Sequence, residues 1–181
     1  MPRKEPSKAK ERKRKKARIP ETGLVDIIKD GLKNDHYLQT LYSRNDPTDT
    51  SEQRIQRIAD YLNLFWRCVK KTWPDVWKKP TSEQRLTHKA GLIAMTQLMP
   101  IITQDIDVTK SDAEEKIMEQ LRKIRGIPWD DKKLLQVIKV GRKTDATILY
   151  NGIQTLYTAD KPVQELVLKD ALGEHFFKLA S

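Results

Sequence analysis

The sequence predicts a mostly α-helical protein, an irregular helical bundle built on a central helical hairpin with a disordered basic arm at its N-terminus. Three observations support this prediction. Apolar residues recur at steps of three and four along several segments, which is the pattern of a helix with one buried stripe. Three segments open with the residue pattern of a helix-capping box. Most of the formal net charge of +10 lies in the first 18 residues, which contain ten Lys or Arg and two Glu.

We expect residues 1–22 to form the disordered arm and residues 23–181 to form one helical domain. The first 18 residues have no large apolar side chain after Met1, so they cannot bury enough surface to offset the entropy lost on ordering. The rest of the chain carries 25 basic and 23 acidic residues, a balance of only +2. The positive excess therefore belongs to the arm.

The central hairpin is expected within residues 51–98. Its first helix begins at the capping box of residues 50–53 and ends at Trp73, because Pro74 disfavours helical geometry in the residue before it. Its second helix begins at a similar box, residues 81–84, and stops before Pro100. The rings of Trp73 and Trp77 are expected to close the junction. The two stripes consist of Ile55, Ile58, Leu62, Phe65, Val69 and Trp73, and of Leu86, Ala90, Ile93, Ala94 and Leu98.

Shorter patterns complete the predicted bundle. Helices are expected over 24–32, 35–42, 111–126, 132–140 and from Pro162 towards Phe176, with a loop or short strand over 103–110. The third capping box, residues 111–114, opens the helix that ends at Gly126. Residues 144–157 fit a helix or a hairpin that turns on Asn151-Gly152, a dipeptide typical of tight hairpins. The helix is favoured, and the hairpin stays open as the alternative.

The chain shows no residue pattern of an enzyme. It contains no Gly-rich phosphate-binding loop and no Gly-x-Ser-x-Gly turn, and its three histidines, His36, His88 and His175, lie in separate segments. The lone cysteine, Cys68, has no partner at a metal-ligand spacing and is expected to be a small packed side chain. We therefore expect no catalytic residue, no metal and no cofactor. The N-terminus has no apolar stretch of the kind found in secretory signals, and the chain has no long apolar run. We therefore expect a cytoplasmic protein without membrane contact.

The basic residues predict contact with nucleic acid. Cations of the arm can neutralise phosphates and release counterions, which positions a protein without reading sequence. The arm has no aromatic residue, so base stacking is not expected from it. Its candidate contacts are Arg3, Lys4, Lys8, Lys10, Arg12, Lys13, Arg14, Lys15, Lys16 and Arg18. A solubilising tail or a targeting run is the alternative interpretation of the same residues.

A second basic cluster lies between Arg67 and Lys89, on both sides of the Trp73–Trp77 corner. It is expected to present a positive rim, and an ordinary solvated helix surface is the alternative that the pattern leaves open. Trp66 is either exposed on this rim or widens the buried face. The candidate contacts of this cluster are Lys70, Lys71, Lys78, Lys79, Arg85 and Lys89.

Three runs of residues carry a family resemblance. They are residues 58–66, the Trp-Pro corner 73–77 and the segment 86–95, with Ile127-Pro128-Trp129 also in character. Over residues 24–157 the chain loosely resembles the helical C-terminal region of DGQHR-domain proteins, bacterial and phage-linked proteins related to the DndB factor of DNA phosphorothioate modification. The Asp-Gly-Gln-His-Arg motif and the α/β portion that bears it are absent. The resemblance implies an accessory, DNA-associated helical module in a prokaryotic or phage setting.

The sequence is therefore compatible with two candidate functions. The first is a nucleic-acid-binding accessory protein, in which the arm supplies electrostatic affinity and the helical body supplies a rim. The alternative is a protein-interaction subunit of a larger DNA-modification or defence complex, in which the arm only assists.

Overall fold

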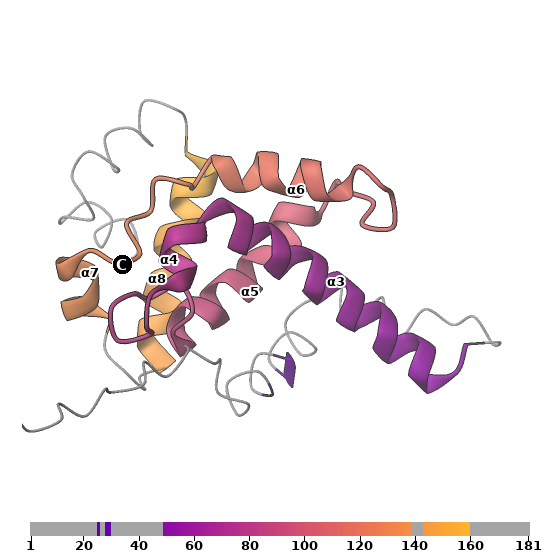
Figure 1. Ribbon diagram of the computed structural model, residues 1–181, viewed down its shortest axis with the longest axis horizontal. Helices are drawn as coiled ribbons and strands as arrows, with labels where there is room; N and C mark the ends of the chain where they lie inside the picture. The colour runs from indigo at the N-terminus through magenta and orange to yellow at the C-terminus, as the bar shows by residue number, and fades with distance from the viewer. Residues whose placement is uncertain (1–24, 26–27, 30–48, 139–142, 160–181) are drawn as a thin grey trace, which may run out of the picture.

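The computed structural model describes residues 25, 28–29, 49–138 and 143–159 of the 181-residue chain. Six helices, labelled as in Figure 1, are α3 (Ser51–Thr72), α4 (Pro74–Lys78), α5 (Lys89–Thr103), α6 (Ala113–Arg122), α7 (Lys132–Val137) and α8 (Lys143–Thr158). The basic arm, the predicted helix 35–42 and the predicted terminal helix lie outside the described residues. Of the predicted helix 24–32, only residues 25 and 28–29 are described, and all three are helical.

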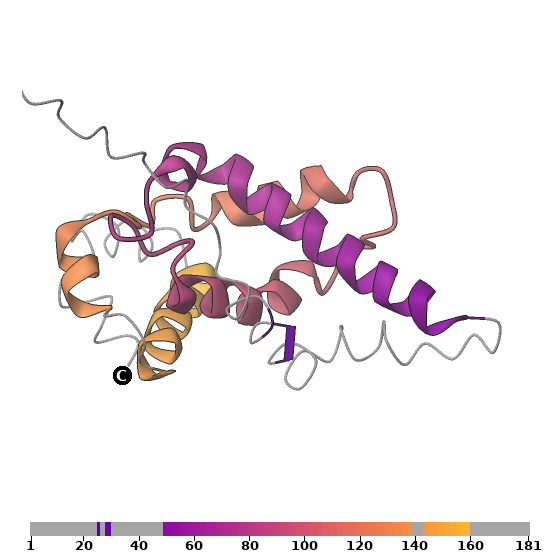
Figure 2. The same ribbon diagram turned by 60° about the horizontal axis from the view of Figure 1, so that its bottom comes forward.

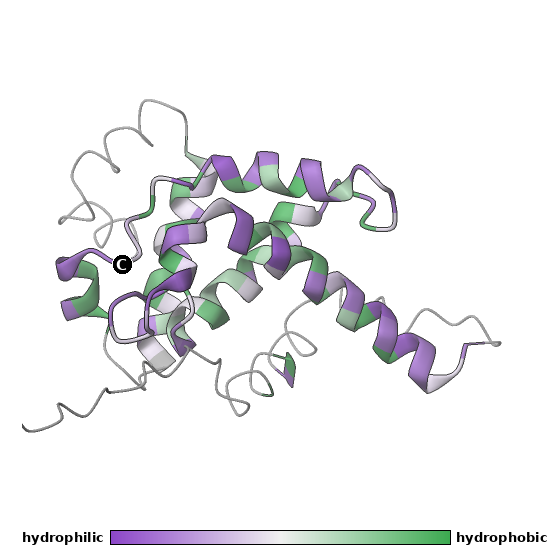
Figure 3. Ribbon diagram, viewed as in Figure 1, coloured by the Kyte–Doolittle hydropathy of each residue, from purple (hydrophilic) through white to green (hydrophobic). Residues whose placement is uncertain are grey.

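The helices form an irregular bundle, which confirms the predicted fold class. α3 packs chiefly against α6, and α5 packs chiefly against α8. The first turns of α3 extend beyond the other labelled helices, as Figures 1 and 2 show. α6 is apolar on the side towards the bundle and hydrophilic on its outer side (Figure 3). α3 and α5 are also joined inside the bundle, where the hydroxyls of Tyr61 and Thr103 lie 2.7 Å apart.

The first predicted capping box is present at the start of α3. The backbone N–H of Gln53 donates to the Thr50 hydroxyl over 3.2 Å, and the backbone N–H of Thr50 donates to the Gln53 side chain over 2.8 Å. The helix ends at Thr72, with Pro74 opening α4, as the proline predicts. The predicted burial of one residue of the apolar stripe on α3 is wrong. Ile55 is 59% exposed, because it lies in the first turns of α3, which extend beyond the other labelled helices.

The predicted start of the second hairpin helix is wrong. Residues 81–88 form turns and loop, and α5 begins at Lys89. The side chain of Gln84 is fully buried and bonds to Thr87 instead of to the backbone three residues before it. The Thr87 N–H donates to the side-chain oxygen Oε1 of Gln84 over 2.9 Å, and the side-chain NH₂ of Gln84 donates to the Thr87 hydroxyl. This local bonding competes with a helix at the same place.

The predicted stop before Pro100 is also wrong, since α5 continues through this proline to Thr103. A proline inside a helix removes one backbone hydrogen bond and costs roughly 3 kcal/mol. The last turn is nevertheless held by tertiary contacts, because Ile102 and Thr103 are buried and the Thr103 hydroxyl faces Tyr61. Burial of this turn therefore outweighs the local preference to stop.

The remaining predictions mostly hold. α6 begins beside the third predicted box and buries its apolar residues, but the N-cap residue Asp112 makes no side-chain capping bond and pairs with Lys116. Turns replace the helix over 123–126. α7 begins at Lys132 as predicted and ends at Val137. Residues 144–157 lie within α8, which confirms the helix and excludes the hairpin. Residues 104–112 form a loop with turns, not a strand.

Gly91 allows the loop before α5 to lie directly against the helix. A methyl group at this position would stand 1.9 Å from the carbonyl oxygen of Arg85 and 2.7 Å from that of Leu86. Both contacts are with backbone atoms, which cannot rotate away as a flexible side chain can. The close approach of loop and helix therefore requires glycine here.

Substituting Gly91→Ala should destabilise the protein by about 1–3 kcal/mol, because the added methyl group displaces the loop backbone. Urea unfolding followed by circular dichroism measures this change. Helix propensity alone predicts the opposite sign, since alanine favours a helix over glycine by roughly 1 kcal/mol. An unfolding midpoint that stays the same or rises would contradict the close contact.

Candidate nucleic-acid interface

The structure separates the predicted basic contacts into three groups. The ten arm residues lie outside the described part of the chain. Four of the predicted rim residues are exposed and Lys79 is partly buried. Arg85 is buried, at 7% exposure. The exposed four are Lys70, Lys71, Lys78 and Lys89.

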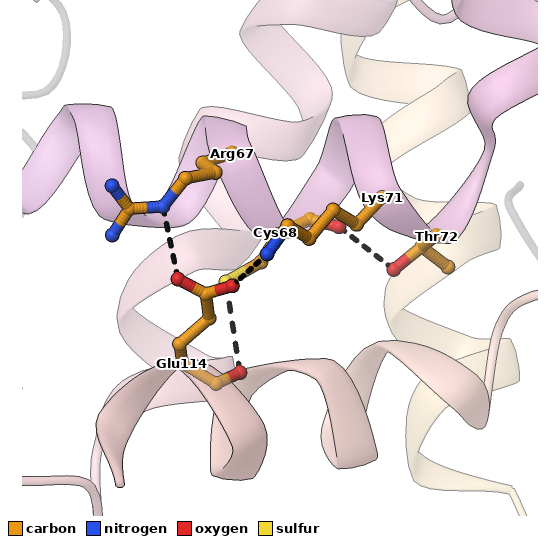
Figure 4. Close-up of polar contacts among 5 residues, drawn as sticks. All are labelled: Arg67, Cys68, Lys71, Thr72 and Glu114. Atoms are coloured by element: carbon orange, nitrogen blue, oxygen red, sulfur yellow. Dashed lines mark hydrogen bonds and ion pairs between the residues drawn. The ribbon is translucent and has the colours of Figure 1, made fainter. Parts of the chain in front are cut away.

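Glu114 neutralises part of the rim at the contact between α3 and α6 (Figure 4). Its carboxylate accepts from Arg67 Nε over 2.9 Å and from the Lys71 ammonium. The Lys71 hydrogen bond is the largest cause that lowers the pKa of Glu114 below its ordinary value. This pair of contacts joins the two helices, and it makes Arg67 and Lys71 less available to an outside phosphate.

Cys68 lies in the same contact and has a packing role, as predicted. The residue is fully buried, and its thiol donates to the backbone carbonyl of Glu114 over 3.7 Å. Burial raises the pKa of the thiol to about 11, and the charge of Glu114 adds to the increase. A thiol with this pKa is protonated at neutral pH and is a poor nucleophile.

The cations that follow the Trp-Pro corner are also paired. Lys79 contacts the carboxylate of Asp130, and Lys78 lies 3.5 Å from Asp75. The second pair is solvated on both sides, so it contributes little stability and can exchange for another anion. Among the described residues, Lys70 forms no ion pair. The rim is therefore a mixed surface in which Lys70 and Lys78 are the most available of the predicted contacts.

Arg85 does not belong to the rim, and its prediction as a surface contact is wrong. Its guanidinium group donates to the backbone carbonyls of Ile138 (2.6 Å), Leu135 (2.7 Å) and Gln84 (3.3 Å). Two of these carbonyls lie at the end of α7, where helical carbonyls lack partners within the helix. The loop sequence therefore places this cation inside the protein, where it holds α7.

Arg85 and His88 lie together with Asp145 in a buried polar region. Burial is the main cause that lowers the pKa of Arg85, and the negative charge of Asp145 opposes this change. His88 forms the N-cap of α5, where its ring Nδ1 accepts from the Ala90 N–H over 3.4 Å. Burial, then the charge of Arg85, lowers the pKa of His88 below 6.5. The His88 ring caps the start of α5, and the Arg85 cation caps the carbonyls at the end of α7. Both buried groups therefore have a structural role.

The four tryptophans form two pairs, and the rings of Trp73 and Trp77, which were expected to close the junction, belong to different pairs. Trp73 is buried and packs edge-to-face on the fully buried Trp129, with ring centroids 5.8 Å apart. Its indole N–H donates to the Arg125 carbonyl over 2.9 Å. Trp77 packs instead on Trp66, with centroids 6.2 Å apart and ring planes at 48°. Both rings of this second pair are partly exposed.

Further exposed cations lie close to the corner, and the sequence reasoning did not single them out. Hydrogen bonds bring the corner together with the turn after α6, through Trp73 and Arg125, and with the start of α7, through Lys79 and Asp130. The exposed cations on these neighbouring segments are Arg122, Lys123, Arg125, Lys132 and Lys133. These cations stand in two short clusters in the sequence, which could have indicated a basic surface, but only the fold places them near the corner.

A shallow groove of about 500 Å³ lies between α3 and the loop before α6. Tyr61, Leu64 and Val108 contribute its apolar lining. Its charged residues are of both signs, and they are Arg57, Asp60, Arg67, Lys110 and Glu114. Arg57 and Arg67 already pair with carboxylates. This mixture favours neither an anion nor a cation.

Comparison with known proteins gave no match to a protein-family model, to a curated protein or to a solved structure. The resemblance to DGQHR-domain proteins therefore stays a prediction from the residues. In the described part of the chain, no helix combines the length and apolar character needed to cross a membrane. The same residues contain no group of three or more His, Cys, Asp or Glu that could hold a metal ion.

Substituting Arg85→Met should destabilise the protein by roughly 1.5–3 kcal/mol, because it removes charged hydrogen bonds and leaves buried carbonyls without donors. Urea unfolding gives the free energy, and hydrogen exchange of the α7 amides locates the loss. Lys70→Met is the matched control, an exposed cation whose removal should leave both measurements unchanged. Equal stability of the two variants would show that Arg85 does not hold α7.

The free energy of unfolding should decrease as the pH falls below about 6.5, because the unfolded chain then protonates His88 while the folded protein resists the proton. The folded-state pKa is the lower one, so this decrease continues until the pH passes that value and then levels off. His88→Asn keeps a good N-cap residue and removes the titration. Thermal unfolding over this pH range should show a smaller decrease for the variant, and identical curves would exclude His88 as the cause.

Proposed function

We propose that this protein is a nucleic-acid-binding accessory protein that holds DNA through its basic N-terminal arm. The observation that carries the proposal is the distribution of charge. Ten of the 35 Lys and Arg residues lie in the first 18 positions, whereas the rest of the chain is close to neutral. Clustered cations bind a polyanion by releasing its counterions, and this affinity needs no base contact.

The ion pairs of the helical body support the proposal that the arm, and not the body, supplies most of the phosphate contacts. Arg67 and Lys71 are engaged by Glu114, and Lys79 is engaged by Asp130. A cation that is already paired must lose one partner to gain another, so its net contribution to phosphate binding is small. The body then serves chiefly to carry the arm and to offer the exposed cations at the tryptophan corner as secondary contacts.

The prokaryotic or phage setting of this proposal comes from the resemblance to DGQHR-domain proteins. DNA in the cytoplasm of such a cell is the polyanion that the arm would meet. A module of this kind, without the α/β portion of that family, would assist a DNA-acting partner and would carry out no chemistry of its own.

A second candidate function is a subunit that binds another protein of a DNA-modification or defence complex. One observation favours it. Ile55 is 59% exposed on the part of α3 that extends beyond the other described helices, and Val137 is 45% exposed on α7. Exposed large apolar residues are frequent at protein contacts, although scattered ones are also common on ordinary surfaces.

Deleting residues 1–18 should remove most of the salt dependence of duplex DNA binding. If about five arm cations contact phosphates, a plot of log K against log salt for the full chain should have a slope near −4 to −5. Fluorescence anisotropy with a labelled duplex measures the affinity at several salt concentrations. A Lys78→Gln, Lys132→Gln, Lys133→Gln variant of the full chain is the control for cations on the body, and it should keep most of the slope.

A slope that is the same with and without residues 1–18 would overturn the role of the arm. Affinity purification before and after nuclease treatment separates the two candidate functions. Partners that are lost with nuclease favour nucleic-acid binding, and partners that persist favour the protein-interaction subunit.

A further inference from the structure

Trp66 and Trp77 form an aromatic surface that the proposed phosphate contacts do not use. Trp66 lies on α3 and Trp77 on α4, and their rings pack at 6.2 Å between centroids with planes tilted by 48°. Each ring is partly exposed, whereas Trp73 and Trp129 are buried. The corner therefore holds one tryptophan pair inside the bundle and leaves a second pair in contact with solvent.

Two exposed cations lie on the same two helices as this second pair of rings. Lys70 follows Trp66 by four residues on α3, so the two side chains are neighbours on one helical face. Lys78 directly follows Trp77, and its contact with Asp75 is fully solvated and weak. The surface thus combines flat π-systems with available positive charge, whereas the arm has charge without aromatic rings.

We propose that Trp66 and Trp77 bind unpaired bases of single-stranded nucleic acid by stacking, with Lys70 and Lys78 contacting the flanking phosphates. Unpaired bases present the faces that stack on aromatic side chains, and this contact tolerates any sequence. The bases of a duplex are stacked on one another and present only their edges. This inference rests on the proposed nucleic-acid function and gives it a substrate class, namely single strands at the body and phosphates of either form at the arm.

The test uses the full chain with a labelled oligothymidylate and a duplex of equal length, at high salt, where the contribution of the arm is suppressed. Trp66→Leu and Trp77→Leu keep an apolar side chain and remove the π-face. Each should weaken oligothymidylate binding by about fivefold or more and leave duplex binding unchanged. Trp66→Phe and Trp77→Phe retain a ring and should keep most of the affinity.

Leucine variants that bind oligothymidylate as tightly as the parent protein would overturn the proposal. So would an equal loss for oligothymidylate and duplex, which indicates a general effect on the surface or the fold. A second measurement does not depend on variants. Oligothymidylate should quench part of the tryptophan emission of the parent protein, and polyglutamate should not. No quenching, or equal quenching by polyglutamate, would also overturn the proposal, the latter because it indicates an acidic partner.

The deletion of residues 1–18 distinguishes a failure here from a failure of the arm. If the shortened chain loses duplex binding but still prefers oligothymidylate, both proposals stand. If the salt dependence is unaffected by the deletion and the tryptophan variants still lose oligothymidylate, only the stacking proposal stands. If the deletion removes all binding and the leucine variants behave as the parent, only the arm proposal stands.

Discussion

The buried residue Arg85 joins more of the described structure than any surface contact does. Its backbone N–H donates to the Trp129 carbonyl over 2.8 Å, its guanidinium group holds the end of α7, and its carbonyl oxygen lies against Gly91 of α5. One loop residue thus contacts the helix that follows it and also Trp129 and the end of α7, which come more than forty positions later in the sequence. A buried charge is costly unless its hydrogen bonds are satisfied, so these segments must fold together for the loop to be stable.

The same loop also bonds to the tryptophan corner. The Trp129 carbonyl accepts from Arg85, and the Trp129 ring is buried against Trp73, whereas Trp77 packs on Trp66 and both of those rings are partly exposed. The helices that carry these two rings also carry Lys70 and Lys78, the most available cations of the rim. In the function proposed above, the arm supplies the electrostatic affinity and the corner supplies the aromatic contacts.

The sequence predicted the structure well where it depends on residues that are close together in the chain. Thr50 and Gln53 form the predicted capping box where both side chains are exposed and bond to the backbone within four residues. The same pattern failed at residues 81–84, because Gln84 is buried and finds Thr87. The burial of Arg85 could not be predicted either, since its partners are carbonyls about fifty positions away. Likewise, the partial exposure of Trp66 and Trp77 follows from the packing of α4, which no periodicity encodes.

The position of Cys68 has a consequence for studying motions of the bundle. The chain has a single thiol, and it lies fully buried where α3 meets α6. A thiol-reactive reagent can reach it only when these two helices part or the whole domain unfolds. Its alkylation rate in the native protein therefore reports how often this contact opens, and no cysteine needs to be introduced or removed to observe it.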